Sequence, residues 1–201
     1  MKINFDLLDK IWISSDSHGF HKNITRGTST WGTNGEFKLR DFDTPEEMTA
    51  QMADNFNSVI PDDGILFHLG DWSFAGEQNI ERFRNMLNVK QIHLLTGNHD
   101  HFIERGTWDH LFSTRQKYME LEIGKHLKFC LFHFPIASWN DIRKGSFHLH
   151  GHQHLQGDLR FGNGKMMDVG VDGNNLFPYK LTDVIDLLKD RRFVAENDHH
   201  A

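Results

Sequence analysis

Five short apolar runs in this chain are each followed at once by side chains that can bind a metal ion. The polar groups are Asp16 and His18 after 10–15, Asp71 after 64–69, Asn98, His99 and Asp100 after 91–96, His133 after 127–132, and His152 and His154 after 147–150. Each run has the length and the branched or aromatic composition of a β-strand. Because ligands bind at the carboxyl ends of strands in α/β sheets, we expect these groups to meet at one edge.

Any one of these residues has an ordinary structural explanation. A lone histidine beside a strand is commonly a hydrogen-bonded core residue, and a lone aspartate commonly caps a turn. Gathering so many polar groups is unfavourable unless they are paired or coordinate a cation. The pattern therefore predicts a metal centre.

The remaining pattern predicts an α/β (α+β) chain. Runs 118–123 and 165–171 are further strands, and helices are expected over 44–60, 77–87 and 181–190. Strands alternating with helices early, followed by a strand-rich second half, indicate sheets covered by helices. The length suits one domain, 1–201, with one sizeable core.

The first expected helix has a clear start signal. Thr44 and Glu47 have capping-box spacing, and Pro45 occupies the favoured first position. Apolar residues then recur at helical spacing and are expected to face the core: Met48, Met52, Phe56 and Val59. The second helix should bury Ile80, Phe83 and Leu87.

Composition excludes some classes of function. The net charge of −6 gives no strong nucleic-acid signal, because coating a nucleic acid requires clustered Lys and Arg. We find neither a signal peptide nor an apolar run that could span a membrane, so a cytoplasmic location without membrane partners is expected.

The ligand types narrow the choice of ion. Imidazole combined with carboxylate favours Mn, with Fe, Zn, Co and Ni as alternatives, over a calcium or magnesium cage made only of oxygen. The ligands also outnumber what one four-coordinate ion uses. Two ions about 3.5 to 4 Å apart could clamp the attacking and leaving oxygens of a phosphoryl group.

The ordered motifs resemble a known family. Asp16-x-His18, Gly70-Asp71, Gly97 to Asp100, His133 and Gly151 to His154 together resemble the signature of calcineurin-like metallophosphoesterases. The stretches SDSHGFHKN, HLGDWSF, LTGNHD and the late DVGVD are most similar to small bacterial and phage-type members. The resemblance implies a four-layer αββα sandwich and a dinuclear site.

It also implies a ligand set. One ion would be held by Asp16, His18, Asp71 and His154, and the other by Asp71, Asn98, His133 and His152. Asp71 would bridge both ions. His99 resembles the general acid that protonates the departing oxygen, and Asp100 beside it could orient the ring.

Other residues could contact the substrate. Arg40 could clamp a phosphate oxygen or could be a solvated loop arginine. His21 and Asn23 follow the first motif closely enough to line a pocket. His148 and His150 are expected mainly to be strand residues or to support a ligand, and His150 is the nearer candidate to contact the substrate or orient a ligand. The Gly- and Thr-rich stretch 27–43 is a candidate functional loop, whose Trp31 and Phe37 could stack on a base or sugar.

The expected activity is hydrolysis of a phosphomonoester or phosphodiester by a metal-bridging hydroxide. Two dications outweigh the two carboxylates and would attract a phosphate anion. Without a large cap insertion, a small nucleotide or 2',3'-cyclic phosphate is the first expected substrate. Alternatives are a phosphoprotein phosphatase or nuclease of the same fold, or a catalytically silent interaction scaffold, which would typically lack His99 or a ligand.

Overall fold

Two five-stranded sheets and four α-helices form the chain in the computed structural model, which describes residues 1–28 and 40–194. The helices are α1 (Pro45–Val59), α2 (Gln78–Asn85), α3 (His101–Arg105) and α4 (Leu181–Leu188). The strands are β1 (Lys2–Ile3), β2 (Ile11–Ser14), β3 (Ile65–His68), β4 (Gln91–Leu95), β5 (Thr114–Gln116), β6 (Tyr118–Ile123), β7 (Leu127–Phe132), β8 (Phe147–His150), β9 (Met166–Asp168) and β10 (Tyr179–Lys180). The fold class is therefore mixed α/β, as expected.

The first sheet has the order β10-β2-β3-β4-β5, and only β10 runs antiparallel to its neighbour. Its central strands are buried on both faces, which explains their continuous apolar sequences. In β2, Ile11 and Ile13 point to one core and Trp12 points to the other. The parallel order places the carboxyl ends of β2, β3 and β4 at one edge.

The second sheet has the order β1-β6-β7-β8-β9. Strands β6 and β7 form an antiparallel hairpin, whereas β7, β8 and β9 are parallel. Alternate residues of β8 separate cleanly: Phe147 and Leu149 join the core between the sheets, so His148 and His150 point to the opposite face.

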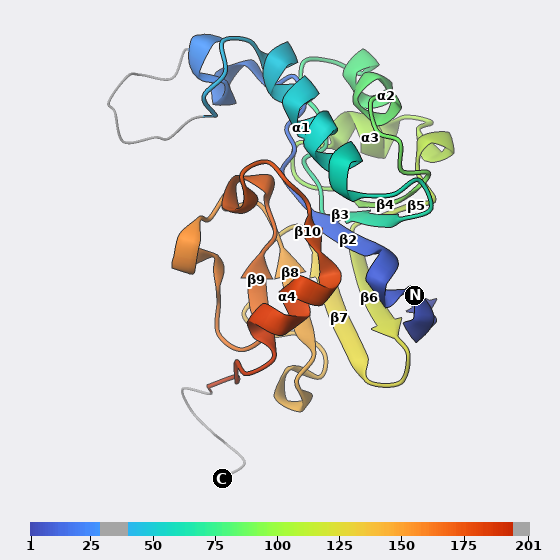
Figure 1. Cartoon of the computed structure of the whole chain (residues 1–201), viewed down its shortest axis with the longest axis vertical. Coiled ribbons are helices and arrows are strands. Elements are labelled where there is room, and N and C mark those ends of the chain that lie inside the picture. The colour runs from blue at the N-terminus through green and yellow to red at the C-terminus, as the bar shows by residue number, and fades with distance from the viewer. Residues whose placement is uncertain (29–39, 195–201) are drawn as a thin grey trace.

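Two apolar cores hold these layers together. One lies between the sheets and contains residues of β2 and β3 together with residues of β6 to β9. The other lies between the first sheet and helices α1, α2 and α3, which cover the sheet's outer face in Figure 1. Helix α4 contacts β2 and β10, and its Leu181, Val184 and Leu188 join the core between the sheets.

Most of the expected elements are confirmed. The three helices and seven strands predicted from the sequence all form, and α1 begins with the complete capping box of Thr44 and Glu47. Predicted run 165–171 is shorter, because β9 ends at Asp168 and the chain turns into a short 3-10 helix (Val171–Asn174). The expected burial of Val59 is wrong: this last residue of α1 is 40% exposed.

Some short elements had not been predicted. Strands β1, β5 and β10 have two or three residues each, and α3 has five. Such elements are too short to show a hydrophobic period. Within 1–28 and 40–194, none of the helices combines the length and apolar character that crossing a bilayer requires.

Candidate metal centre

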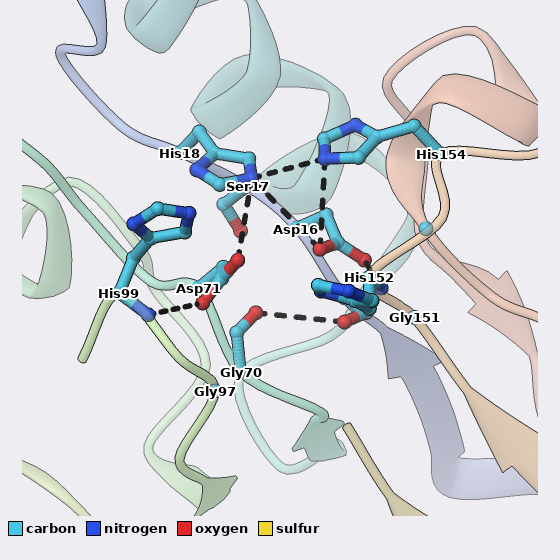
Figure 2. A network of polar contacts seen from close by, with 12 residues as sticks. Asp16, Ser17, His18, Gly70, Asp71, Gly97, His99, Gly151, His152 and His154 are labelled. Atoms are coloured by element: carbon cyan, nitrogen blue, oxygen red, sulfur yellow. Dashed lines mark hydrogen bonds and ion pairs between the residues drawn. The ribbon is translucent and has the colours of Figure 1, made fainter. Parts of the chain in front are cut away.

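The predicted polar groups meet at the carboxyl ends of five strands. Asp16 and His18 follow β2, Asp71 follows β3, Asn98 follows β4, His133 follows β7, and His152 and His154 follow β8. Close contacts connect all seven side chains into one cluster, part of which is shown in Figure 2. The two sheets thus each contribute to one site.

The backbone at this site is strained. Five of the seven residues have left-handed φ values: Asp16 (56°), His18 (48°), Asp71 (58°), His152 (73°) and His154 (52°). Such conformations cost about 1 to 3 kcal/mol each in residues other than glycine and are concentrated at functional sites. Their clustering distinguishes these loops from ordinary strand connections.

Asp71 lies at the middle of the cluster. One carboxylate oxygen, Oδ2, is 3.6 Å from Nε2 of His18 and 3.5 Å from Nε2 of His133. The other oxygen, Oδ1, accepts a hydrogen bond from the backbone N–H of His99 at 2.9 Å. The carboxylate therefore faces imidazoles from both sides, as Figure 2 shows for His18.

The first half of the cluster contains Asp16, His18 and His154. Nε2 of His18 and Nε2 of His154 are 3.1 Å apart, and each is 3.8 Å from Oδ1 of Asp16. Burial raises the pKa of Asp16 to about 7 and lowers the pKa of His18 well below its ordinary value. Oδ1 of Asp16 is buried without a hydrogen-bond donor.

The proton on His154 shows what this half of the cluster can bind. Nδ1 of His154 is 2.6 Å from the Asp172 carboxylate, which can only accept, so Nδ1 carries the proton. In a neutral ring, Nε2 then presents a lone pair toward His18 and Asp16. Lone pairs that converge on one point are stabilised by a cation.

The second half of the cluster contains Asn98, His133 and His152. Nδ1 of His133 donates to the carbonyl of Leu69 at 2.8 Å, which leaves Nε2 to face Oδ1 of Asn98 at 2.9 Å. Nδ1 of His152 is also 2.9 Å from that oxygen. His133 is buried, whereas Asn98 and His152 are exposed, so this half opens to solvent.

Two glycines allow the loops to approach so closely. A Cβ at Gly151 would collide with Oγ of Ser15 and Oδ2 of Asp16. A Cβ at Gly97 would collide with Oδ1 of Asp71. Gly151 within the histidine-rich stretch therefore makes room for the carboxylate of Asp16. Gly97 at the start of GNHD makes room for the carboxylate of Asp71.

Arg40 is placed differently from the prediction. Its side chain is buried, so it is not the solvated loop arginine that was the alternative. It donates to the backbone carbonyls of Asp16 (2.6 Å) and Ser17 (2.5 Å) and forms two 2.9 Å hydrogen bonds to Asp172. The expected phosphate clamp is wrong, because these partners already occupy the guanidinium.

Asp172 is a site residue that the sequence analysis missed. It joins Arg40 to His154 and thereby fixes the ring orientation of a candidate ligand. Burial opposes its ionisation, but Arg40 and His154 hold the pKa of Asp172 well below its usual range. The late DVGVD motif contains this residue, so the motif was the available signal.

Asp100 also differs from expectation. Its carboxylate accepts three backbone hydrogen bonds, from Asp71 (2.7 Å), Gly97 (2.8 Å) and Trp72 (2.9 Å). Burial raises the pKa of Asp100 to about 7 although these donors act in the opposite direction. Asp100 ties the loops after β3 and β4 together, and these contacts do not include the His99 ring that it was expected to orient.

His99 lies at the exposed side of the cluster. Its ring centroid is 5.6 Å from that of His18 and 4.8 Å from that of Phe74. A small cavity of about 50 Å³ lies beside it. His99 is thus adjacent to the candidate ligands and accessible from solvent.

His21 lies near the site, as predicted. Its ring packs on Phe74 with centroids 3.8 Å apart and is 5.5 Å from that of His18. Burial lowers the pKa of His21 to about 4, and nearby His99 contributes. Asn23 is half-buried in a short 3-10 helix (Lys22–Ile24).

The four clustered histidines divide into two pairs with different surroundings. His148 and His150 are buried in β8 and bond backbone carbonyls of Cys130 (3.1 Å) and Gly151 (3.0 Å). The substrate contact considered for His150 is wrong, because the residue is only 1% exposed, and the expectation that both are strand residues is confirmed. Only His152 and His154, after Gly151, reach the cluster. Trp31, Phe37 and most of the candidate loop 27–43 lie outside the described residues.

Comparison with known proteins identifies similar chains without an assigned activity. No family model matches the sequence. An uncharacterized protein from Methanocaldococcus jannaschii is 27% identical over 191 residues, which cover 92% of this chain and 94% of that protein. A crystal structure of a protein of unknown function from Aquifex aeolicus has a TM-score of 0.62 and 18% identity, covering 88% of this chain and 98% of that one. This likeness shows a shared fold.

Proposed function

We propose that this chain is a dinuclear-metal-dependent phosphoesterase of the calcineurin-like type. The observation that carries the proposal is the position of Asp71. Its carboxylate lies between two sets of nitrogen and oxygen donors, 3.6 Å from His18 and 3.5 Å from His133. A carboxylate so placed suits the bridge between two cations.

The residues present fit two divalent transition-metal ions. Asp16, His18, Asp71 and His154 would hold one ion, and Asp71, Asn98, His133 and His152 the other. Oδ1 of Asp16 is buried without a hydrogen-bond partner, and Nε2 of His18 lies 3.1 Å from Nε2 of His154. A cation bound between these atoms would offset the free-energy cost of burying them. Mn is favoured by the mixed imidazole and carboxylate ligands, with Fe, Zn, Co and Ni as alternatives. When bound, such ions supply Lewis-acid stabilisation to phosphoryl oxygens and acidify water.

Residues of the chain would complete the reaction. His99, exposed and adjacent to His18, would donate a proton to the leaving oxygen of the ester. Its backbone N–H holds Oδ1 of Asp71, so the proton donor and the bridging carboxylate are positioned together. The Arg40–Asp172 pair would hold His154 in the required tautomer.

The fold supports the same assignment at a coarser level. Helices α1 to α3, the first sheet and the second sheet form three successive layers that agree with an αββα sandwich. A fourth layer, made of helices on the outer face of the second sheet, would complete the proposed sandwich.

The proposed substrate is a small phosphomonoester or phosphodiester, with nucleotides and 2',3'-cyclic phosphates first. The exposed Asn98, His99 and His152 leave the centre open to solvent, so a larger phosphorylated protein or a nucleic acid is the alternative within the same reaction class. The presence of His99 and all seven candidate ligands disfavours a catalytically silent scaffold.

The first experiment replaces the central carboxylate. Asp71→Asn should fold normally, lose most of its bound metal and lose hydrolysis by at least about 10²-fold, because one residue serves both ions. Metal analysis by mass spectrometry and ester hydrolysis provide the readouts. Asp158→Asn, at an exposed position, is the matched control. Two ions per chain with normal turnover in Asp71→Asn would refute the bridging role.

The second experiment tests the metal and the substrate class together. Chelation should abolish activity on a panel of mono- and diesters, and Mn should restore it better than Mg, because Mg prefers oxygen ligands and dehydrates reluctantly. Full activity after complete chelation would exclude the proposed chemistry. Stoichiometric metal binding without hydrolysis of any ester would favour the scaffold.

A further inference from the structure

A second polar site lies at the other end of strand β8 from the candidate metal centre. A cavity of about 560 Å³ is lined by the short 3-10 helix η5 (Ile142–Lys144), by Lys165 just before β9 and by the segment that follows α4. Of the nine described residues that line it, six are cationic: Arg143, Lys144, Lys165, Lys189, Arg191 and Arg192. None of these nine is acidic.

This charge is unusual for the chain. The whole protein has a net charge of −6, so a concave surface with six cations opposes the general trend. Lys144 and Lys189 pair with Asp141 (2.8 Å) and Asp186 (3.2 Å), which lie outside the lining. Lys165, Arg191 and Arg192 form no ion pair among the described residues, so their charge leaves a positive field in the cavity.

Two of the cationic side chains, Arg191 and Lys165, are held in place by contacts with the rest of the protein. Arg191 donates to the carbonyls of Gly162 (3.0 Å) and Gly164 (3.3 Å), and its guanidinium stacks on Phe161. Lys165 lies 4.8 Å from the centre of the Phe147 ring. This preorganisation lowers the entropy lost when a ligand binds.

The end of the described chain is fixed in the same region. Asn163 exchanges two hydrogen bonds with the backbone of Val194, at 2.7 and 2.9 Å. These bonds hold the segment with Arg191 and Arg192 beside the loop before β9. The cationic wall is therefore formed by tertiary structure and not by a freely moving terminus.

The cavity is separate from the metal centre. Strand β8 has η5 before its first residue and the candidate ligands His152 and His154 after its last. A four-residue strand alone spans roughly 10 Å. The length of the strand therefore separates the cavity from the candidate metal ligands.

We propose that this cavity binds a small anion with several linked phosphate groups. The volume lies within the range of about 300 to 1,000 Å³ typical of small-molecule sites. Guanidinium groups match phosphate oxygens in a bidentate manner, and lysines add point charges. Cations gathered in one cavity, instead of along a stripe, favour a compact anion over an extended polymer.

The test measures binding of tripolyphosphate to the full chain by calorimetry. Lys165→Gln combined with Arg192→Gln should weaken binding by about tenfold or more, because each charge-assisted contact contributes substantially. Lys125→Gln combined with Arg105→Gln removes the same charges at exposed positions elsewhere and should change binding less than twofold. Metal content is measured and matched among all three proteins, and hydrolysis of a nitrophenyl ester should be unchanged.

Hydrogen exchange locates the ligand independently. Tripolyphosphate should protect peptides that cover 142–145 and 189–193. ATP in place of tripolyphosphate distinguishes a nucleotide from a bare phosphate chain, and either source supports the proposal. Equal weakening in both double variants, absence of saturable binding, or binding of a single-stranded oligonucleotide but not of tripolyphosphate would overturn it.

Discussion

The left-handed residues of the candidate centre need compensation from their neighbours. The backbone at Asp16 and Ser17 is fixed by Arg40, which donates to both carbonyls, and the backbone at Asp71 is fixed by Asp100. Aspartate and histidine tolerate left-handed conformations better than branched residues do. The strained geometry is thus supported by buried charges whose own oxygens and nitrogens are all engaged.

The acid function of His99 can be separated from metal binding. His99→Ala should keep its fold and metals, lose about 10² to 10⁴ in rate on an alkyl phosphoester, and lose much less on a nitrophenyl ester. The reason is that an alkoxide needs a proton to leave whereas a nitrophenolate does not. The ratio of the two rates is the measurement, because errors in active fraction cancel.

His133→Ala is the contrasting variant. It removes a candidate ligand, so both substrates should be affected alike and the metal content should fall. Equal losses on both esters in His99→Ala would assign His99 to substrate binding or metal support. His21, whose ring centroid is 5.5 Å from that of His18, would then be the next candidate acid.

Asp172 should act through His154. Asp172→Asn should preserve the fold and lower metal affinity by about 10- to 100-fold, because the amide no longer fixes the imidazole tautomer as a carboxylate does. Titration of the metal-free variant with Mn measures this, and Asp158→Asn is the exposed control. Affinity within twofold of the unmodified chain would show that Asp172 only supports the loop.

At the scale of elements, the strands bring the ligands together and the turns present them. Parallel pairing aligns β2, β3 and β4, and β7 and β8 repeat this arrangement in the second sheet. The turn after β8 comes so close to the turn after β2 that the N–H of His152 bonds Oδ2 of Asp16 at 2.9 Å. The centre therefore depends on the packing of one sheet against the other.

Gly151→Ala tests this close approach. The new methyl group would meet Ser15 and Asp16, which should cost about 1 to 3 kcal/mol of stability and reduce metal content. Gly157→Ala is the matched control, since Gly157 has φ of 54° but open space around it. The control should lose about 1 kcal/mol of stability from backbone strain and keep its metals. Equal metal content in both variants would contradict the steric argument.

At the scale of the whole molecule, the two proposed sites lie at opposite ends of β8 and would prefer ligands of opposite charge. Carboxylates and imidazoles gather at one end, and lysines and arginines gather at the other. The proposed activities are consequently independent and can be removed separately by substitution.

Buried histidines predict that acid destabilises the molecule. Burial lowers the pKa of His68 to about 3 and of His93, His148 and His150 to about 4. The unfolded chain binds protons near pH 6.5 whereas the folded chain does not, so their contribution to stability is complete above pH 6.5 and is lost as pH falls toward 4. The buried Asp16 and Asp100, whose pKa values are raised, act in the opposite direction in metal-free protein.

His93→Gln isolates this effect away from the metal centre. The fall in unfolding free energy between pH 7 and pH 5, measured with urea, should be smaller than in the unmodified chain by about 1 to 2 kcal/mol. His126→Gln, at an exposed position, should leave the pH dependence unchanged. An unchanged slope in His93→Gln would show that His93 binds protons equally in the folded and unfolded chains.

Local sequence by itself determined the principal strands, three helices and the identity of the clustered polar residues. Alternation, capping and the polar residues after each strand are properties of neighbouring positions, so they can be read without knowledge of the fold. Only the tertiary structure decided the partners of those residues. Arg40 and Asp172 are separated by 132 positions, and β1 pairs with β6 across more than a hundred residues. Such contacts depend on how the sheets pack, and for that reason the functions of Arg40, Asp100, His150 and Asp172, and the cationic cavity, could not be predicted from local pattern.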